Sequence, residues 1–410
     1  MAEQSSRNIV VIGGGPAGVF AAIEAKRTDP AAHVLLLTDE ACEPYEKPPL
    51  SKAVLTGKAL PEHALIAGPG GTAKHNVVLE QTAVVTGIDR ASRQVVTAAN
   101  KRYRYDALVL ATGSVVRELA QLPSGMKRVH YLRTEADACP LAAALRGCRH
   151  LVVVGGGLIG LEAAASATEL GVRTTVLEVA PRILARVCDE ETGAFISEQH
   201  KQHGVDLHTA TAIVSVRSSD DGVEIETSAG AIFLADVVVV GTGVKPNDAL
   251  AAAAGLAADG GITVDERCRT SDPAIFAAGD AVRFPAVHGL VRLENWKHAQ
   301  DQGAIAGRNA AGSNEVYRTV PSFWSEQYDL YIQGVGWPPP QPAERVRRPL
   351  AGKSMLSFEI ADGILAYAMG INAQRDLAAA RRLIERRIKV DAAALADPGR
   401  PLTSLLKASV

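Results

Sequence analysis

Asn8-Ile-Val-Val-Ile-Gly13-Gly-Gly15-Pro-Ala-Gly18 joins a β-branched strand to a G-x-G-x-x-G turn, and an Ala-rich stretch follows it. This order predicts a strand, a tight turn and a helix. The three glycines serve different purposes, since Gly13 makes the turn, Gly15 lets the backbone approach a pyrophosphate, and Gly18 lets the helix pack close to the strand. The helix N-terminus offers free N–H groups and a positive dipole end to phosphates. The stretch therefore predicts a dinucleotide-binding fold.

The same pattern recurs in the middle of the chain. Residues 151–154 form an apolar run that leads into Gly155-Gly-Gly157-Leu-Ile-Gly160 and another Ala-rich helix. In each copy a second strand follows and ends on an acid that can bind a ribose, about 20 residues after the last glycine in the fingerprint. The first copy offers Asp39 or Glu40 for this role, and the second offers Glu178. Two complete copies predict two nucleotide sites.

The second site favours NADH over NADPH. A carboxylate at Glu178 would accept hydrogen bonds from a ribose 2′-hydroxyl and would repel a 2′-phosphate. Arg182 and Arg186 follow closely and are the counter-argument, since either could pair with a phosphate. The natural occupants of two such sites are a bound flavin and a diffusible nicotinamide, because hydride passes between them.

Three further segments fit this plan. Ala111-Thr112-Gly113 and the run that ends at Gly243 each close a buried strand with small residues, and both indicate crossings between domains. Residues 274–280 form a strand that delivers Asp280 beside a glycine. Asp280 could hydrogen-bond the sugar-alcohol chain of a flavin, or it could only cap a helix.

Composition narrows the class of protein. The 410 residues are too many for one core, and the length indicates two or three domains. The formal charge of −2 gives no support to a nucleic-acid or membrane partner. The five cysteines form no C-x-x-C pair, so neither a metal site nor a dithiol centre is expected. Without a signal peptide or an apolar span, a cytoplasmic location is expected.

Several motifs resemble the FAD-dependent ferredoxin reductases of bacterial oxygenase systems, the group of putidaredoxin, rubredoxin and biphenyl-dioxygenase reductases. The most specific is the run 43–52, EPYEKPPLSK, which is similar to the family's P-Y-x-R-P-P-L-S-K with Lys47 in place of Arg. Matches also occur at 294–303, 323–329 and 395–398, while the Arg-rich run 337–353 matches no motif.

This resemblance implies a glutathione-reductase-like α/β fold with two Rossmann-like dinucleotide-binding domains and a C-terminal α/β domain. The FAD domain would comprise residues 1–115 and 246–320, the NADH domain 116–245, and the C-terminal domain 321–410.

The resemblance also implies which residues act. Hydride transfer needs no acid or base, so the catalytic residues should be positioners. Lys52 is expected near the flavin N5 or O4, paired with Glu162 on the first turn of its helix, and Pro48 should stiffen the loop beside the flavin. Trp324 could stack near the flavin or lie on the electron exit route. The less favoured alternatives are that Lys52 is a solvated lysine and that Glu162 only offsets a helix dipole, whereas for Trp324 a place in the core is as well supported as a place near the flavin.

The helix expected to begin near Trp296 should point its N-terminus at the flavin, where positive potential stabilises the reduced anion. The full set of cofactor-binding candidates is Gly13, Gly15, Pro16, Ala17, Gly18, Asp39, Glu40, Lys47, Lys52, Val84, Ala111, Thr112, Gly113, Asp280, Asn295, Trp296 and Ala299 for FAD, and Gly155, Gly157, Leu158, Ile159, Gly160, Glu178, Arg186 and Gly243 for NADH.

The expected electron acceptor is a two-iron ferredoxin, with rubredoxin as the second choice, and the expected oligomeric state is a monomer. Ferredoxins of this kind are usually acidic, which favours a basic docking surface. A late helical stretch supplies candidates, although the same side chains could simply form a solvated helix face. These candidates are Arg375, Arg381, Arg382, Arg386 and Arg387.

Two other functions remain open. Relatives in this superfamily reduce peroxide, oxygen or disulfides through a cysteine beside the flavin, and Cys42 lies in that region. However, the redox cysteine of those enzymes begins the helix itself, a place that Pro48 or Pro49 holds here. A flavin-based redox-signalling role, as in the more distant apoptosis-inducing factors, is disfavoured because the chain is compact and nearly neutral.

Overall fold

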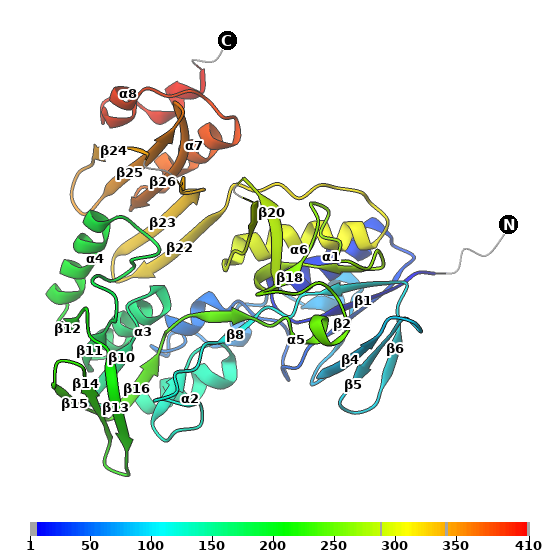
Figure 1. The fold of residues 1–410 in the computed structure, drawn as a ribbon, viewed down its shortest axis with the longest axis horizontal. Helices are drawn as coiled ribbons and strands as arrows, with labels where there is room; N and C mark the ends of the chain where they lie inside the picture. The colour runs from blue at the N-terminus through cyan, green and yellow to red at the C-terminus, as the bar shows by residue number, and fades with distance from the viewer. Residues whose placement is uncertain (1–5, 288, 341–342, 408–410) are drawn as a thin grey trace.

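The computed structural model describes residues 6–287, 289–340 and 343–407. Three five-stranded sheets dominate it. Two are parallel and follow the two glycine fingerprints, and the third is antiparallel and lies near the C-terminus. Figure 1 shows them as three neighbouring parts, with the C-terminal sheet in orange at the upper left. The chain is therefore of mixed α/β class, as the sequence predicts.

The first parallel sheet combines segments from distant parts of the chain. Its strand order is β19-β7-β1-β2-β3, and every neighbouring pair is parallel. Four strands come from the N-terminal part of the chain, whereas β19 joins only after the second parallel sheet is complete. The bounds are β1 (Asn8–Ile12), β2 (His33–Leu37), β3 (Val78–Glu80), β7 (Ala107–Leu110) and β19 (Ile275–Ala277).

Two small three-stranded sheets accompany this region: an antiparallel one of order β4-β5-β6, and a mixed one of order β18-β20-β21 in which β18 and β20 are parallel. Their strands are β4 (Val85–Asp89), β5 (Gln94–Thr97), β6 (Arg102–Arg104), β18 (Ile262–Thr263), β20 (Val282–Ala286) and β21 (Gly289–Val291). Short 3₁₀ helices are η1 (Pro48–Ser51), η2 (Pro61–His63), η3 (Thr72–His75), η4 (Gly279–Ala281) and η5 (Leu402–Lys407).

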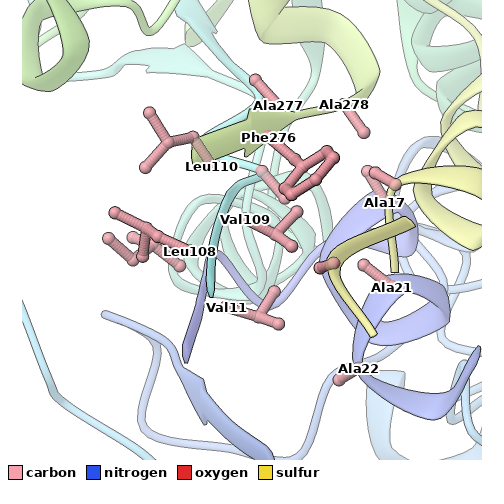
Figure 2. Close-up of a cluster of buried hydrophobic side chains, with 14 of the residues drawn as sticks. Val11, Ala17, Ala21, Ala22, Leu108, Val109, Leu110, Phe276, Ala277 and Ala278 are labelled. Atoms are coloured by element: carbon pink, nitrogen blue, oxygen red, sulfur yellow. The ribbon is translucent and has the colours of Figure 1, made fainter. Parts of the chain in front are cut away.

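Helices α1 (Pro16–Thr28) and α6 (Trp296–Ala310) lie side by side on the first sheet (Figure 1). Figure 2 shows Val11, Val109 and Phe276 from three neighbouring strands beside the small α1 side chains. Glycines make the close helix contact possible: a Cβ on Gly307 would lie 2.0 Å from the carbonyl oxygen of Ala21. Close packing of alanine and glycine thus fills this core with few of the aromatic residues, which are 4% of the sequence.

The second parallel sheet has the order β12-β11-β10-β16-β9, with a three-stranded antiparallel sheet β13-β14-β15 beside it. Its strands are β9 (Val129–Tyr131), β10 (His150–Val154), β11 (Arg173–Leu177), β12 (Val205–His208), β13 (Ile213–Ser218), β14 (Val223–Thr227), β15 (Ile232–Ala235) and β16 (Val237–Val240). Its helices are α2 (Glu135–Leu145), α3 (Leu158–Glu169) and α4 (Glu190–Gln202).

An antiparallel pair of strands connects the two parallel-sheet regions. β8 (Ser114–Val116) leaves the first sheet and β17 (Val244–Pro246) returns towards it, followed by the short helix α5 (Ala249–Ala253). The two glycine-containing turns that the sequence marks as crossings, at Gly113 and Gly243, lie at the ends of this pair. The chain therefore passes out and back along a single two-stranded ribbon.

The C-terminal part is an antiparallel sheet of order β22-β23-β26-β25-β24 that packs against α7 and α8. The expected helical stretch for the docking arginines is shorter than predicted, because Arg386 is the C-cap of α7 and Arg387 lies beyond it with φ +50°. The bounds are β22 (Ser322–Gln327), β23 (Leu330–Gly336), β24 (Glu344–Pro349), β25 (Met355–Ala361), β26 (Ile364–Ile371), α7 (Gln374–Glu385) and α8 (Ala392–Ala396).

The Arg-rich run that matches no motif ties this last part together. Arg348 is 3% exposed, and its guanidinium donates to the carbonyl oxygens of Leu395 and Arg400. Arg347 pairs with Asp189 at 2.7 Å and with Glu191 at 2.6 Å, at the N-terminus of α4. These arginines therefore hold the C-terminal part in place and fasten it to the second parallel-sheet region.

Within the described residues, none of the helices is both long enough and apolar enough to cross a membrane. The same residues contain no group of three or more His, Cys, Asp and Glu side chains that could hold a metal ion.

The close contact of α1 with α6 gives a stability prediction. Gly307→Ala should lower the free energy of unfolding by about 2 kcal/mol, because the added Cβ overpacks a rigid backbone contact. Gly147→Ala is the matched control, since no described atom lies within 4 Å of its new Cβ. Urea unfolding of both variants measures the difference, and equal stability would contradict the close helix contact.

Candidate functional site

The first glycine turn is fixed by backbone contacts on two sides and open on the third. Gly13 has φ +115°, and a Cβ there would lie 2.1 Å from the carbonyl oxygen of Ala111. A Cβ on Gly18 would lie 1.8 Å from the carbonyl oxygen of Gly13. By contrast, no heavy atom of the described residues lies within 4 Å of a Cβ built on Gly15, the N-cap of α1. The open side therefore fits a pyrophosphate at the helix N-terminus.

The second turn repeats this geometry. A Cβ on Gly155, which has φ +109°, would meet the carbonyl oxygen of Gly241 at 2.5 Å. A Cβ on Gly160 would meet the carbonyl oxygen of Gly155 at 2.1 Å, whereas the N-cap Gly157 is nearly unobstructed. Leu158 and Ile159 form the first turn of α3, and Ile159 is 45% exposed. Both fingerprints thus form the same structure.

Glu178 lies beside the second turn, at the end of β11. Its carboxylate accepts from the backbone N–H of Gly156 at 2.5 Å and from that of Ala180 at 2.7 Å. The competing cations differ in placement: Arg182 donates to backbone carbonyls, including that of Ala185 at 3.0 Å, whereas Arg186 is exposed. Arg186 points towards Gly243, where a Cβ would lie 3.6 Å from its Nη2. Arg182 is therefore engaged by its own loop.

The two acids predicted at the first ribose differ. Asp39 is exposed, whereas Glu40 already accepts hydrogen bonds from the hydroxyl of Tyr45 and, at 2.9 Å, from the ammonium of Lys47. Asp39 is thus the more accessible acid, because the Glu40 carboxylate is already bonded to Lys47 and Tyr45. Val84, also predicted to contact cofactor, is 48% exposed.

The predicted ion pair between Lys52 and Glu162 is formed, with Nζ 2.8 Å from Oε2. Lys52 also donates to the carbonyl oxygen of Pro48 at 3.0 Å. The predicted position of Glu162 on the first helical turn is wrong: α3 begins at Leu158, which places Glu162 in the second turn and 3% exposed. A dipole-offsetting carboxylate belongs at an exposed first turn, so that alternative for Glu162 loses its basis.

Two serines missed at the sequence level complete the surroundings of Glu162. Ser51 and Ser325 each donate a hydrogen bond to its carboxylate, the latter to Oε1 at 2.5 Å. Both lie inside motifs that mark the resemblance, which is the only signal in the sequence that could have identified them. The carboxylate therefore receives donors from η1 and from β22.

Asp280 follows β19 within η4, as expected for an acid at a strand end. Its carboxylate accepts from the hydroxyl of Ser114 at 3.0 Å and from Nη2 of Arg133 at 3.1 Å. Arg133 is not among the residues predicted from the sequence, although it follows the end of strand β9 as Glu178 and Asp280 follow the ends of their strands. Thr112 meanwhile donates to the carbonyl oxygen of Asn247 at 2.6 Å, which joins the two crossing segments.

Helix α6 begins at Trp296, with Asn295 as an N-cap that accepts from the backbone N–H of His298. Ala299 is buried within its first turn, close to the position that a Cβ on Gly279 would occupy. Trp296 meets Trp324 of β22 edge to face, with ring centroids 6.0 Å apart and an interplanar angle of 72°. Trp324 therefore contacts the element expected to face the flavin.

The comparisons with known proteins agree with this geometry. Residues 7–303 match the family model described as pyridine nucleotide-disulphide oxidoreductase, and residues 322–406 match the reductase C-terminal model. The chain belongs to the pyridine nucleotide-disulphide oxidoreductase family.

Relatives within the family narrow the type. The ferredoxin–NAD(+) reductase component of the anthranilate 1,2-dioxygenase system from Burkholderia cepacia is 37% identical, over 96% of this chain and 98% of its own. Rhodocoxin reductase from Rhodococcus erythropolis is 36% identical over 92% and 89%. A solved structure of the covalent putidaredoxin reductase–putidaredoxin complex matches with a TM-score of 0.92 and 33% identity, over 98% and 99%.

These matches confirm the predicted resemblance and the predicted fold of two dinucleotide-binding regions with a C-terminal domain. They also confirm an oxidoreductase of the pyridine nucleotide-disulphide family that uses FAD and NADH. The two glycine turns of this chain fit those dinucleotides, because each has an open, N–H-rich helix end at the N-cap glycine.

The cysteine-based alternative fits this member of the family poorly. Burial raises the pKa of the Cys42 thiol to about 12, and a hydrogen bond to Glu135 adds to the shift. A thiol needs a lowered pKa to act as a nucleophile or redox centre near neutral pH. Cys42 packs instead in a small apolar cluster around Leu50.

Cys42→Ser should therefore leave NADH-dependent turnover within about two-fold of the unchanged protein, since the protonated thiol has no chemical role. Steady-state NADH oxidation with an artificial acceptor measures this, and Cys139→Ser, at an exposed thiol, is the control. A loss of NADH oxidation confined to Cys42→Ser would bring the cysteine-based alternative back.

Proposed function

We propose that this protein takes hydride from NADH onto FAD and passes single electrons to a small iron–sulfur protein that feeds an oxygenase. The observation that carries the proposal is the pair of open glycine turns, with the Lys52–Glu162 ion pair bridging η1 and the helix of the second turn. The names of two similar relatives, a ferredoxin–NAD(+) reductase component and a rhodocoxin reductase, support it.

Bound FAD supplies the chemistry that a polypeptide lacks, since it accepts two electrons together and releases them singly. The chain's own residues hold and orient it. Gly13, Gly15 and Gly18 with the N-terminus of α1 would bind the pyrophosphate, Asp39 the ribose, and Asp280 with Arg133 the ribityl chain. The N-terminus of α6 would present positive potential to the flavin ring.

Lys52 and Glu162 act in this proposal by position. Glu162 fixes the Lys52 ammonium, and the carbonyl of Pro48 limits its movement from the other side. Glu162 belongs to the helix that follows the second glycine turn, whereas Lys52 follows η1, in the connection between β2 and β3 of the first parallel sheet. The pair would therefore align the two dinucleotide sites and help to exclude water between them.

Purified protein assayed for NADH-dependent cytochrome c reduction, with and without a panel of two-iron ferredoxins and rubredoxins, tests the function. Strong stimulation by one iron–sulfur protein, weakening as salt rises, is expected. Rapid NADH consumption by peroxide or oxygen, without stimulation by any iron–sulfur protein, would contradict it.

The preference for NADH is proposed to come from Glu178. Glu178→Ala should lower the ratio of kcat/KM for NADH to kcat/KM for NADPH about ten-fold, because the substitution removes the repulsion of the NADPH 2′-phosphate. Kinetics with both nucleotides measures the ratio. Arg182→Ala is the control, since that side chain is bonded to its own loop. An unchanged ratio in Glu178→Ala would mean that another residue selects the cofactor.

Docking of the iron–sulfur protein is proposed on the arginines of α7. Arg375, Arg382 and Arg386 are exposed, and their spacings of seven and four residues place them on one side of the helix. Arg381 is set apart, because it pairs with Glu385 at 2.8 Å. Arg387 is exposed beyond the helix end.

Arg382→Glu with Arg386→Glu should raise the KM for the ferredoxin about ten-fold at low salt, since electrostatic steering is reversed. The reduction of ferricyanide by NADH should not change. Arg146→Glu, an exposed arginine at the end of α2, is the control. If the ferredoxin KM responds equally to both charge reversals, docking lies elsewhere.

We propose further that the FAD domain comprises residues 1–115 and 246–320, the NADH domain 116–245 and the C-terminal domain 321–410. The segmented first parallel sheet and the β8–β17 ribbon support this division. A cytoplasmic location is proposed on the grounds of composition and cysteine usage, and a monomer because that is the default of the family.

A further inference from the structure

A continuous series of buried polar side chains ends on the carboxylate of Glu162. Ser325 lies 2.5 Å from its Oε1, and Nε2 of Gln327 lies 3.0 Å from the Ser325 hydroxyl. His200 of α4 continues the series, with Nε2 2.9 Å from the Gln327 oxygen and Nδ1 3.0 Å from the Tyr328 hydroxyl. The series therefore runs from α4 through β22 to α3.

The chemistry of the groups fixes the direction of every bond. A carboxylate paired with an ammonium can only accept, so Ser325 must donate to Glu162. The Ser325 oxygen then accepts from the amide nitrogen of Gln327, which leaves the Gln327 oxygen to accept from Nε2–H of His200. Nδ1 of His200 is then an acceptor for the hydroxyl of Tyr328. All donors thus point towards Glu162, and such chains polarise one another.

Burial makes this arrangement rigid. Ser325 and His200 are fully buried, and Gln327 is 1% exposed. Leaving one of these groups without a partner would cost its desolvation, so each holds the next in a single orientation. His200 suits its place as a neutral donor and acceptor, since burial lowers its pKa to about 4.

The Tyr328 end of the series of polar side chains lies beside a cavity. Beyond Tyr328, whose ring stacks on that of His203 at 3.7 Å, lies a cavity of about 610 Å³. Its walls include Lys52 and Glu162 as well as Tyr328 and His203. The first and last members of the series, Glu162 and Tyr328, thus line the same cavity as Lys52.

We propose that Ser325, Gln327 and His200 are positioning residues that hold the Glu162 carboxylate, and through it the Lys52 ammonium, in the orientation that hydride transfer needs. The inference rests on the proposed function of the Lys52–Glu162 pair. It gives the C-terminal part of the chain a role within the hydride-transfer site, in addition to any contact with an electron acceptor.

The test combines single and double variants of the FAD-loaded protein. Ser325→Ala should slow the reduction of the flavin by NADH about ten-fold, because Glu162 loses a charge-assisted donor. Gln327→Met, which keeps the side-chain volume, should slow flavin reduction less. In this variant Ser325 loses the hydrogen bond from Gln327 but can still donate to Glu162. Ser322→Ala, on the opposite face of β22, is the control and should leave the rate unchanged.

Coupling separates positioning from a merely structural effect. Ser325→Ala should add little to the slowing in Glu162→Gln, because residues of one network are not additive. The visible absorption spectrum of the bound flavin should shift in Ser325→Ala as it does in Glu162→Gln, and not in Ser322→Ala. Thermal unfolding of each variant shows how much of any effect is lost stability.

The outcomes distinguish two failures. If Glu162→Gln leaves flavin reduction and the spectrum unchanged, the proposed function of the ion pair fails and the positioning role fails with it. Suppose instead that Glu162→Gln slows flavin reduction. If adding Ser325→Ala then slows that variant by as much as it slows the unchanged protein, or if Ser325→Ala changes only the unfolding temperature, the positioning inference is overturned while the ion pair keeps its role.

Discussion

A buried carboxylate must be paired and fully hydrogen-bonded, and Glu162 is the place where this requirement joins the parts of the chain. Removing one partner of a buried ion pair costs roughly 3–5 kcal/mol, because the other charge is left without compensation. The donors to Glu162 are Lys52 and Ser51, in the β2–β3 connection of the first parallel sheet, and Ser325 in the C-terminal sheet. One side chain on α3 therefore joins segments that belong to all three five-stranded sheet regions.

The two glycine turns could be predicted because their signal is local. The close packing of Gly18 on Gly13 and of Gly160 on Gly155 follows from the G-x-G-x-x-G spacing after a strand, and the structure shows both contacts. The strand-end positions of Glu178 and Asp280 follow from the same short-range order. The helical turn that carries Glu162 was predicted wrongly because the boundary depends on which glycine is the N-cap, and here it is Gly157.

Contacts between distant segments could not be predicted from the sequence. Ser325 meets Glu162 only because β22 packs against α3, and nothing in the sequence of either segment indicates that the other is its neighbour. Arg347 and Arg348 match no motif for the same reason. Tertiary packing determines their partners, which lie at the N-terminus of α4 and near the end of the chain. A basic run alone could equally have indicated a docking surface, whereas these two guanidiniums are engaged inside the molecule.

Strand β22 shows how one short segment can serve two sites. Neighbouring residues on a strand face opposite sides, so Trp324 and Ser325 necessarily point in opposite directions. The first meets Trp296 at the start of α6, and the second meets Glu162 on α3. A shift of the strand by one residue would exchange these faces and lose both contacts together. The position of the aromatic pair beside the proposed flavin site and the orientation of the ion pair are therefore set by a single register, that of β22 against β23.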